Sequence, residues 1–155
     1  MRELRIHHFF DIIRDYGSGK TADPHPYGHS YHLAAGEIYE NKLTRIKLII
    51  NNDDICANCE KLEEGHCIDT IDHRADFSGK QEFNNHLDKK IMACMNYYDG
   101  QLVDVKEIIR NAGKYIEEIY ELYDGNDIEH TRARKENVKS GIRKKLKELG
   151  LDESI

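Results

Sequence analysis

Several features that mark common protein classes are missing from this sequence. It has no charged and then apolar leader, and its longest strictly aliphatic run, Leu48 to Ile50, is far shorter than the ~20 residues that span a bilayer. It has no Gly-rich phosphate loop, no GxSxG elbow, no HExxH motif, no internal repeat and no low-complexity tract. We therefore expect a cytoplasmic protein without membrane contact, outside the enzyme classes that those motifs mark.

The composition predicts one globular domain. The chain has 155 residues, of which 39% are apolar and 34% are charged, and no shift in composition marks a second domain. Both prolines lie in residues 21–30, a segment whose aromatic and imidazole side chains indicate an ordered loop. The formal net charge of −6 argues against a surface coated by nucleic acid.

Apolar spacing predicts a mainly α fold with at most a small β element. Helices are expected within residues 5–17, 30–43, 79–100, 101–125 and from 127 onward. The first helix is expected to be short, because a Gly-Ser-Gly break follows at Gly17 to Gly19. Residues 45–50, RIKLII, are the one convincing strand, and the turn residues NNDD follow it.

Three of the four cysteines lie in one acidic loop, DDICANCEKLEEGHC, at residues 53–67. Cys56 and Cys59 are separated by two residues, a spacing at which a tight turn brings both sulfurs to one ion, and Cys67 follows. In a reducing cytoplasm such cysteines are more often metal ligands or free thiols than disulfides. Nearby carboxylates raise the pKa of a thiol, which disfavours a catalytic cysteine, whereas a bound cation offsets them. The loop therefore predicts a metal site.

The fourth metal ligand is a choice between Cys94, His66 and His73. Cys94 lies on the apolar stripe of its expected helix, where a lone cysteine is usually a small core residue. The same stripe faces inward, where a loop cluster would also lie. Because three thiols are already close in sequence, we favour Cys94 as the fourth ligand. His66, directly beside Cys67, fits a donor to a ligand or a solvated residue.

The order of the segments RIHHFF, YGHSY, KLIINNDDICANCEKLEEGHC and MACMNYYDG resembles a family of small bacterial and archaeal proteins of unknown function that are labelled iron–sulfur binding. The similarity runs from Arg5 to Gly100. Members often carry a cysteine where this chain has Asp11, and further cysteines near Cys94. This chain keeps four cysteines, enough for one four-thiolate site. The resemblance implies an iron–sulfur cluster as the cofactor.

Four thiolates suit both zinc and an iron–sulfur cluster. Zinc sites usually use two close pairs of ligands, whereas here one pair is followed by two single cysteines, an uneven spacing that is more usual for clusters. We therefore expect an iron–sulfur cluster, with zinc as the alternative. If only the three loop cysteines bind a cubane 4Fe–4S cluster, one iron stays open as a Lewis acid. If all four bind, electron transfer, sensing or a structural role is expected.

Five of the nine histidines lie in the first 32 residues. His7 and His8 begin the first expected helix, and the segment PHPYGHSYH adds His25, His29 and His32. Together with Asp11 they predict a polar pocket, because imidazole titrates near neutral pH and serves as a general acid or base. We take His8, His29 and Asp11 as catalytic candidates, and His7, His25 and His32 as cofactor-binding candidates. A second metal site and ordinary surface histidines are the alternatives.

The C-terminal helix is basic, since residues 131–149 hold eight Lys or Arg against two Glu. Such a helix fits a nucleic-acid or anionic partner, or a solvated helix laid across an acidic domain. Without aromatic interleaving or a groove-reading motif, we favour the solvated helix and do not expect nucleic-acid binding. The expected single domain, residues 1–155, thus consists of a metal-binding core, residues 1–126, and this helix, residues 127–155.

The leading hypothesis is an iron–sulfur protein, which as an enzyme would act on a small-molecule substrate through an open iron and the N-terminal histidines. A redox partner is the other expected partner. The competing hypothesis is a zinc-stabilised binding or regulatory module that uses the basic C-terminal helix. The substrate and the oligomeric state do not follow from the sequence.

Overall fold

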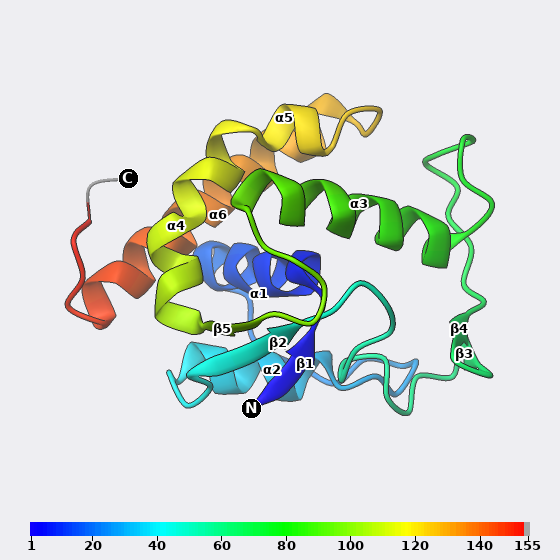
Figure 1. Cartoon of the computed structure of the whole chain (residues 1–155), viewed down its shortest axis with the longest axis horizontal. Coiled ribbons are helices and arrows are strands. Elements are labelled where there is room, and N and C mark those ends of the chain that lie inside the picture. The colour runs from blue at the N-terminus through cyan, green and yellow to red at the C-terminus, as the bar shows by residue number, and fades with distance from the viewer. Residues whose placement is uncertain (154–155) are drawn as a thin grey trace.

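The computed structural model describes residues 1–153 as one mainly helical domain with a small sheet (Figure 1). The helices are α1 Ile6–Ser18, α2 Tyr31–Tyr39, α3 Lys80–Met95, α4 Val105–Glu117, α5 Ile119–Leu122 and α6 Ile128–Glu148. The strands are β1 Arg2–Leu4, β2 Arg45–Leu48, β3 Leu62–Glu63, β4 His66–Cys67 and β5 Leu102–Asp104. The predicted fold class is confirmed. None of the helices in the described part of the chain combines the length and the apolar character that a membrane span requires.

The three-stranded sheet is built around the predicted strand. In β2 the side chains of Ile46 and Leu48 are buried and alternate with more exposed ones, as expected for a strand with one face on the core. β1 pairs with β2 in parallel and β5 pairs with β2 antiparallel, in the order β1-β2-β5. These two partner strands were not predicted, because three residues each are too few to show an alternating pattern.

Helix α1 runs through the centre of the molecule, between the sheet and the other long helices (Figure 1). Its apolar side chains are fully buried on more than one face: Ile6, Phe9, Phe10, Ile12 and Ile13. Phe10 stacks on Tyr115 of α4 with ring centroids 3.7 Å apart. A helix that is apolar on several faces is expected at the centre of a domain rather than on its surface.

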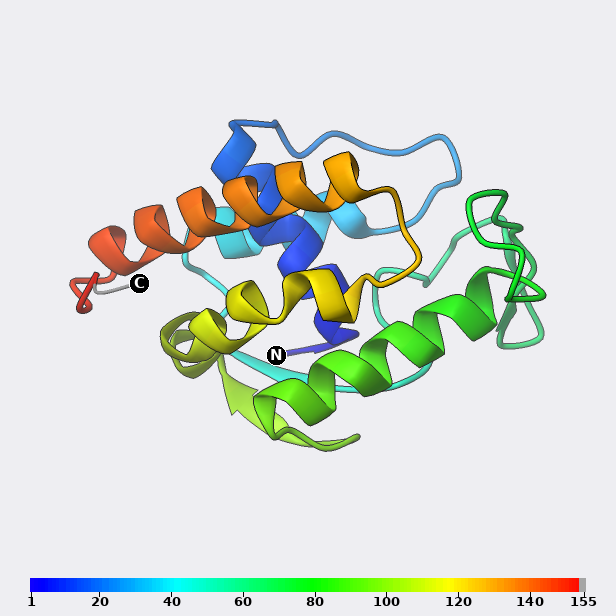
Figure 2. The same cartoon turned by 90° about the horizontal axis from the view of Figure 1, so that it is seen from above.

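Helix α6 crosses over α1 at a pair of glycines (Figure 2). A Cβ atom on Gly17 would meet the main-chain oxygen of Asn137, and one on Gly141 would meet that of Ile13. Gly17 was expected to break the first helix, but α1 continues to Ser18 and ends at Gly19, whose φ of 80° suits a helix C-cap. Gly17 therefore allows α6 to approach α1 closely and does not end the helix.

Helix α6 belongs to the core of the domain. Val138, Ile142 and Leu146 on one side of the helix are buried. Lys145 is also fully buried, and its Nζ donates to the main-chain oxygens of Ile38 at 2.7 Å and Tyr39 at 2.9 Å. The C-terminal helix after residue 126 therefore packs as part of the same core as residues 1–126. The charge of Lys145 is used in contacts inside the protein.

A buried ion pair joins the start of α1 to the middle of α3. The Arg5 guanidinium donates to Oδ2 of Asp88 at 2.8 Å, and the two side chains are 1% and 0% exposed. The other oxygen of Asp88 accepts from the main-chain N–H of His7 at 3.0 Å and lies 2.8 Å from its Nδ1. Burial alone would raise the pKa of Asp88, but the charges and hydrogen bonds of His7 and Arg5 lower it.

Substitution of either crossing glycine should destabilise the protein. Gly17→Ala and Gly141→Ala force main-chain atoms of α1 and α6 apart, so we expect each to lower the free energy of unfolding by at least about 2 kcal/mol in denaturant titrations. The matched control is Gly113→Ala in α4, where an added Cβ meets nothing within 4 Å. There the loss of backbone freedom in the unfolded chain should stabilise by about 0.5 to 1 kcal/mol. Equal effects at the three positions would contradict the close crossing.

Removal of the buried carboxylate should be costly. Asp88→Asn leaves Arg5 buried without its counter-charge, and we expect a loss of about 3 to 5 kcal/mol at neutral pH. Because folding lowers the pKa of Asp88, its contribution is present above the unfolded carboxyl pKa of about 4 and is lost as the pH falls toward the lower, folded value. The variant should therefore show a weaker loss of stability in acid than the wild type. Glu40→Gln, which breaks an exposed pair with Lys42, should leave the unfolding curve unchanged.

Candidate functional site

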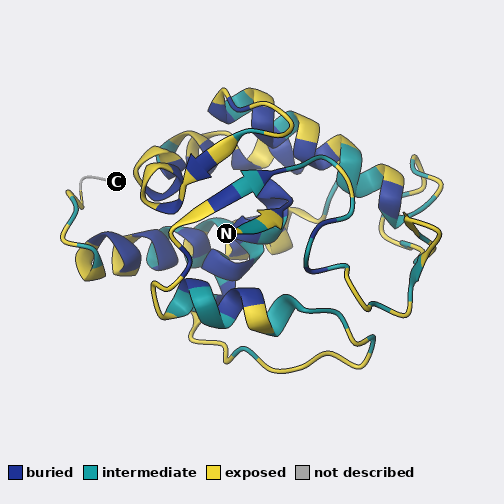
Figure 3. Cartoon of the chain, turned by 60° about the horizontal axis from the view of Figure 1, so that its bottom comes forward, coloured by how far each residue is buried: buried dark blue, intermediate teal, exposed yellow. Residues whose placement is uncertain are grey.

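One cavity of about 460 Å³ lies between α1, the first half of α3, the start of α6 and the loops at residues 20–30 and 51–79. These loops carry mostly exposed and half-exposed residues, whereas α1 is largely buried (Figure 3). The walls include all three cysteines of the acidic loop and, from the histidine candidates, His7, His8, His25 and His29. Two sets of residues that the sequence predicted separately therefore border the same space.

The acidic loop contains one tight turn and one short hairpin. The N–H of Cys59 donates to the carbonyl of Cys56 at 3.0 Å, which closes the turn expected from their spacing. The strands β3 and β4 then form a hairpin that pairs Leu62 with Cys67. The hairpin turn consists of Glu64 and Gly65, both with positive φ, as a two-residue hairpin loop requires. The hairpin thus places Cys67 opposite Leu62, which lies three residues after Cys59.

The thiol of Cys56 is tied to a buried carboxylate. Its Sγ lies 3.5 Å from Oδ1 of Asp53, which also accepts from the N–H of Ile55 at 3.1 Å. Burial and the charge of Asp53 raise the pKa of Cys56 to about 12. At neutral pH this thiol is protonated, so it is unsuited to act as a free nucleophile, in agreement with the acidic sequence around it.

Cys94, the predicted fourth ligand, lies away from the cavity. It is about two turns beyond Leu87 on α3, which amounts to ~10 Å along the helix axis, and Leu87 itself still lines the cavity. The thiol of Cys94 faces α4, where its Sγ is 3.6 Å from the carbonyl oxygen of Lys114. The apolar stripe does face inward as expected, but the end that carries Cys94 packs on α4 and the other end approaches the loop (Figure 1).

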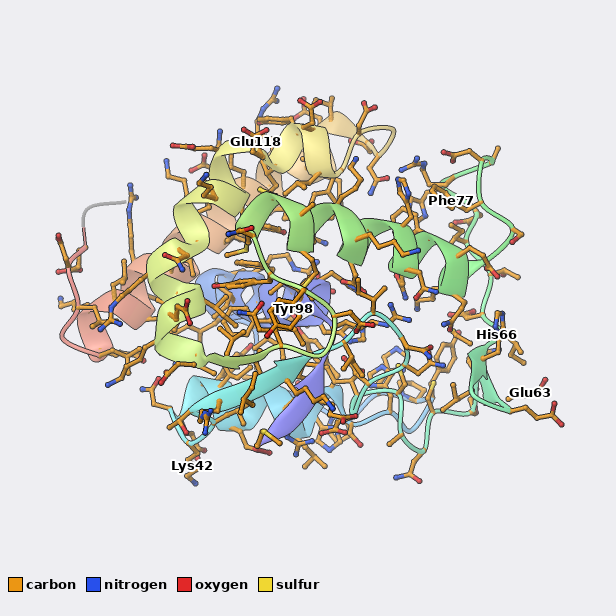
Figure 4. The ribbon with its side chains drawn as sticks, in the orientation of Figure 1. Lys42, Glu63, His66, Phe77, Tyr98 and Glu118 are labelled. Atoms are coloured by element: carbon orange, nitrogen blue, oxygen red, sulfur yellow. The ribbon has the colours of Figure 1, made fainter. Side chains whose placement is uncertain are left out.

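The two histidine alternatives for a fourth ligand differ in position. His73 lines the cavity and packs edge-on against Phe83. His66 lies on the outer edge of the β3–β4 hairpin, where its ring is 54% exposed and its Nε2 is 3.7 Å from Glu82 (Figure 4). His73 is therefore the alternative that shares the cavity with the three loop cysteines.

His7 and His8 are each held by a buried carboxylate. Nδ1 of His8 lies 2.7 Å from Oδ2 of Asp53, and Nδ1 of His7 lies 2.8 Å from Asp88. The two rings are neighbours, with centroids 4.3 Å apart. Burial by itself lowers the pKa of His8, but the charge and hydrogen bond of Asp53 outweigh it and raise the pKa. A carboxylate on Nδ1 fixes the ring and leaves Nε2 for a metal, a proton or a ligand.

The three histidines of the proline-containing loop are placed differently. His25 and His29 line the cavity and stack with ring centroids 4.4 Å apart. Burial and the neighbouring His25 lower the pKa of His29, so it is neutral near pH 7. His32 is not among the residues that line the cavity, and its Nδ1 is buried without a hydrogen-bond partner in the described chain. The predicted cofactor-binding role fits the position of His25 but not that of His32.

Asp11 reaches the cavity but is committed to an ion pair. Its Oδ1 accepts from Arg134 of α6 at 2.7 Å, and Arg14 is 3.4 Å away. Burial alone would raise the pKa of Asp11, but the two guanidinium groups hold it far below its usual range. A carboxylate that stays ionised and paired is a poor proton acceptor or donor, so the predicted catalytic role does not fit. Asp11 positions Arg134 instead.

The buried, paired roles of Asp53, Asp88 and Arg134 were not predicted from the sequence. Asp88 falls at an inward position of the α3 stripe, one residue after Leu87, and an acidic residue there is a signal of a buried partner. Arg134 stands four residues before Val138 on the buried side of α6, but that position alone does not name its partner.

Within residues 1–153, no group of three or more His, Cys, Asp or Glu side chains is arranged closely enough to bind one ion. The cysteines of the described chain are free thiols. Comparison with protein-family models, curated proteins and solved structures found no match to this chain. The resemblance to proteins labelled iron–sulfur binding therefore stays a prediction.

Proposed function

We propose that this protein binds an iron–sulfur cluster through Cys56, Cys59 and Cys67, with one iron left open toward the cavity. The observation that carries the proposal is that these three thiols and the oriented histidines border one cavity while Cys94 does not. Three thiolates on a cubane cluster leave a coordination position for a substrate atom.

The donor set supports this assignment. Thiolates are the usual ligands of iron–sulfur clusters, and all three come from one loop whose turn and hairpin keep them close along the chain. The raised pKa of Cys56 means that its proton must leave when a metal binds, and the charge of a bound cluster compensates for the nearby Asp53. Because the loop is mostly exposed, it can close around a cluster without disturbing the core.

The histidines give the cavity its chemistry. When bound, the cluster would supply a Lewis-acid iron. His8, held by Asp53 and with a raised pKa, is suited to donate a proton, whereas His29, with a lowered pKa, is suited to accept one. His7 is oriented in the same way by Asp88. This pairing of an acid and a base in one cavity favours an enzyme over a simple electron carrier.

The competing zinc module draws less support from the structure. Its proposed interaction surface, α6, packs on α1, and two of its cations, Arg134 and Lys145, are used in internal contacts. A zinc ion in the loop nevertheless uses the same three thiols, with His73 as a fourth ligand within the same cavity. Metal analysis separates the two assignments.

Protein purified without oxygen should be brown and contain about four iron and four acid-labile sulfide per chain. Cys59→Ala should lose the visible absorption, whereas Cys94→Ala, the matched control, should keep the absorption and the iron content because its thiol lies outside the cavity. Elemental analysis, sulfide determination and absorption spectra on the three proteins measure this.

Two results would contradict the proposal. A colourless wild type with one zinc per chain would establish the zinc assignment, and His73→Ala would then be expected to weaken zinc retention. Loss of the cluster from Cys94→Ala in a folded protein would mean that the loop moves to reach α3 and that no iron is open. Circular dichroism on each variant distinguishes ligand loss from unfolding.

A further inference from the structure

The charge of the cavity is opposite to that of the protein. The whole chain has a formal net charge of −6. Among the residues that line the cavity, five are Lys or Arg and three are Asp. The cations come from separate elements: Arg14, Lys20, Lys61, Lys80 and Arg134. A concave positive site in an acidic protein concentrates anions, because its field is focused by the surrounding low-dielectric walls.

The residues behind the lining do not cancel this charge. Asp53 and Asp88 hold the two histidines, and Arg5 lies beside Asp88. With these three residues added, the cavity and its immediate support contain six Lys or Arg side chains and five Asp side chains. One positive charge therefore remains even when all histidines are neutral. His7 and His8 have their Nδ1 atoms occupied by carboxylates, so each ring presents its Nε2 as the remaining polar atom.

The cations differ in how far they are already paired. Arg134 is 8% exposed and binds Asp11 through one terminal nitrogen, while its Nε is buried without a hydrogen-bond partner in the described residues. Lys80 is 3.3 Å from Asp69. Lys61 lies 5.1 Å from the ring centroid of Tyr27, and no ion pair is recorded for it within residues 1–153. The cavity thus offers one buried guanidinium and two adaptable ammonium groups.

We propose that the ligand of this cavity is a small oxyanion with more than one negative charge, of the phosphate or polycarboxylate class. Arg134 lines the cavity from α6, His7 and His8 line it from α1, and Lys61 and Lys80 contribute from the loop and the start of α3. A cavity of about 460 Å³ holds a metabolite-sized molecule and excludes a folded partner. The inference deepens the proposed function by naming its substrate class, but the anion-binding groups are distinct from the cysteines.

The test is isothermal titration calorimetry of the full chain with inorganic phosphate and, separately, with citrate. It is carried out at low ionic strength on the wild type and on metal-free Cys59→Ala. Saturable binding of at least one anion to both proteins is expected, and preference for one of the two identifies the class. Lys61→Gln and Lys80→Gln should each weaken the binding about five- to tenfold, the loss expected for one charge-assisted contact.

Lys47→Gln is the matched control, because it removes the same charge from β2, where Lys47 pairs with Glu3 outside the cavity. Equal weakening by Lys47→Gln and the cavity variants would show non-specific attraction and overturn the inference. So would the absence of saturable binding at about 10 mM anion, where even a millimolar site is occupied. Anion binding by a chain that never carries a cluster would refute the proposed function alone, and a cluster without anion binding would refute this inference alone.

Discussion

The buried contact of Asp88 with Arg5 and His7 is the interaction on which the site depends. It connects β1 and the start of α1 with the middle of α3, and its groups are almost completely removed from water. A buried charge is tolerated only when its partners are in place, so the relative position of α1 and α3 is fixed by this contact as much as by apolar packing. The same carboxylate orients His7, so the position of this cavity residue is set by a buried contact of the core.

Asp53 plays the corresponding part for the cysteine loop. One of its oxygens accepts from the main chain of Arg5 at 2.6 Å and lies beside His8, and the other contacts Ile55 and Cys56. The first residues of the acidic loop are therefore attached to α1 through the same side chain that aligns an imidazole. This explains why two motifs far apart in sequence, the double histidine and the Asp-Asp-Ile-Cys element, meet at one cavity.

Structural features that depend on a repeating apolar pattern could be predicted from the sequence. Features that depend on one specific contact between distant residues could not. The long helical segments and the strand that contains Ile46 and Leu48 could be predicted from apolar periodicity. The role of Gly17 could not, because a glycine that ends a helix and one that admits a neighbouring helix look the same in one dimension. Cys94 was predicted as the fourth metal ligand because it lies on the inward face of its helix. That position does not show whether the side chain meets the cysteine loop or α4, and in the structure it meets α4.

The two halves of the cavity differ in how firmly they are built, and this difference bears on function. His7 and His8 are anchored by buried carboxylates on a helix at the centre of the core, whereas the cysteines lie on a loop with two-residue strands and exposed side chains. His7 is held by Asp88 of helix α3, but Asp53, which holds His8, belongs to the cysteine loop and also contacts Cys56, so a movement of this loop would reach His8 before His7.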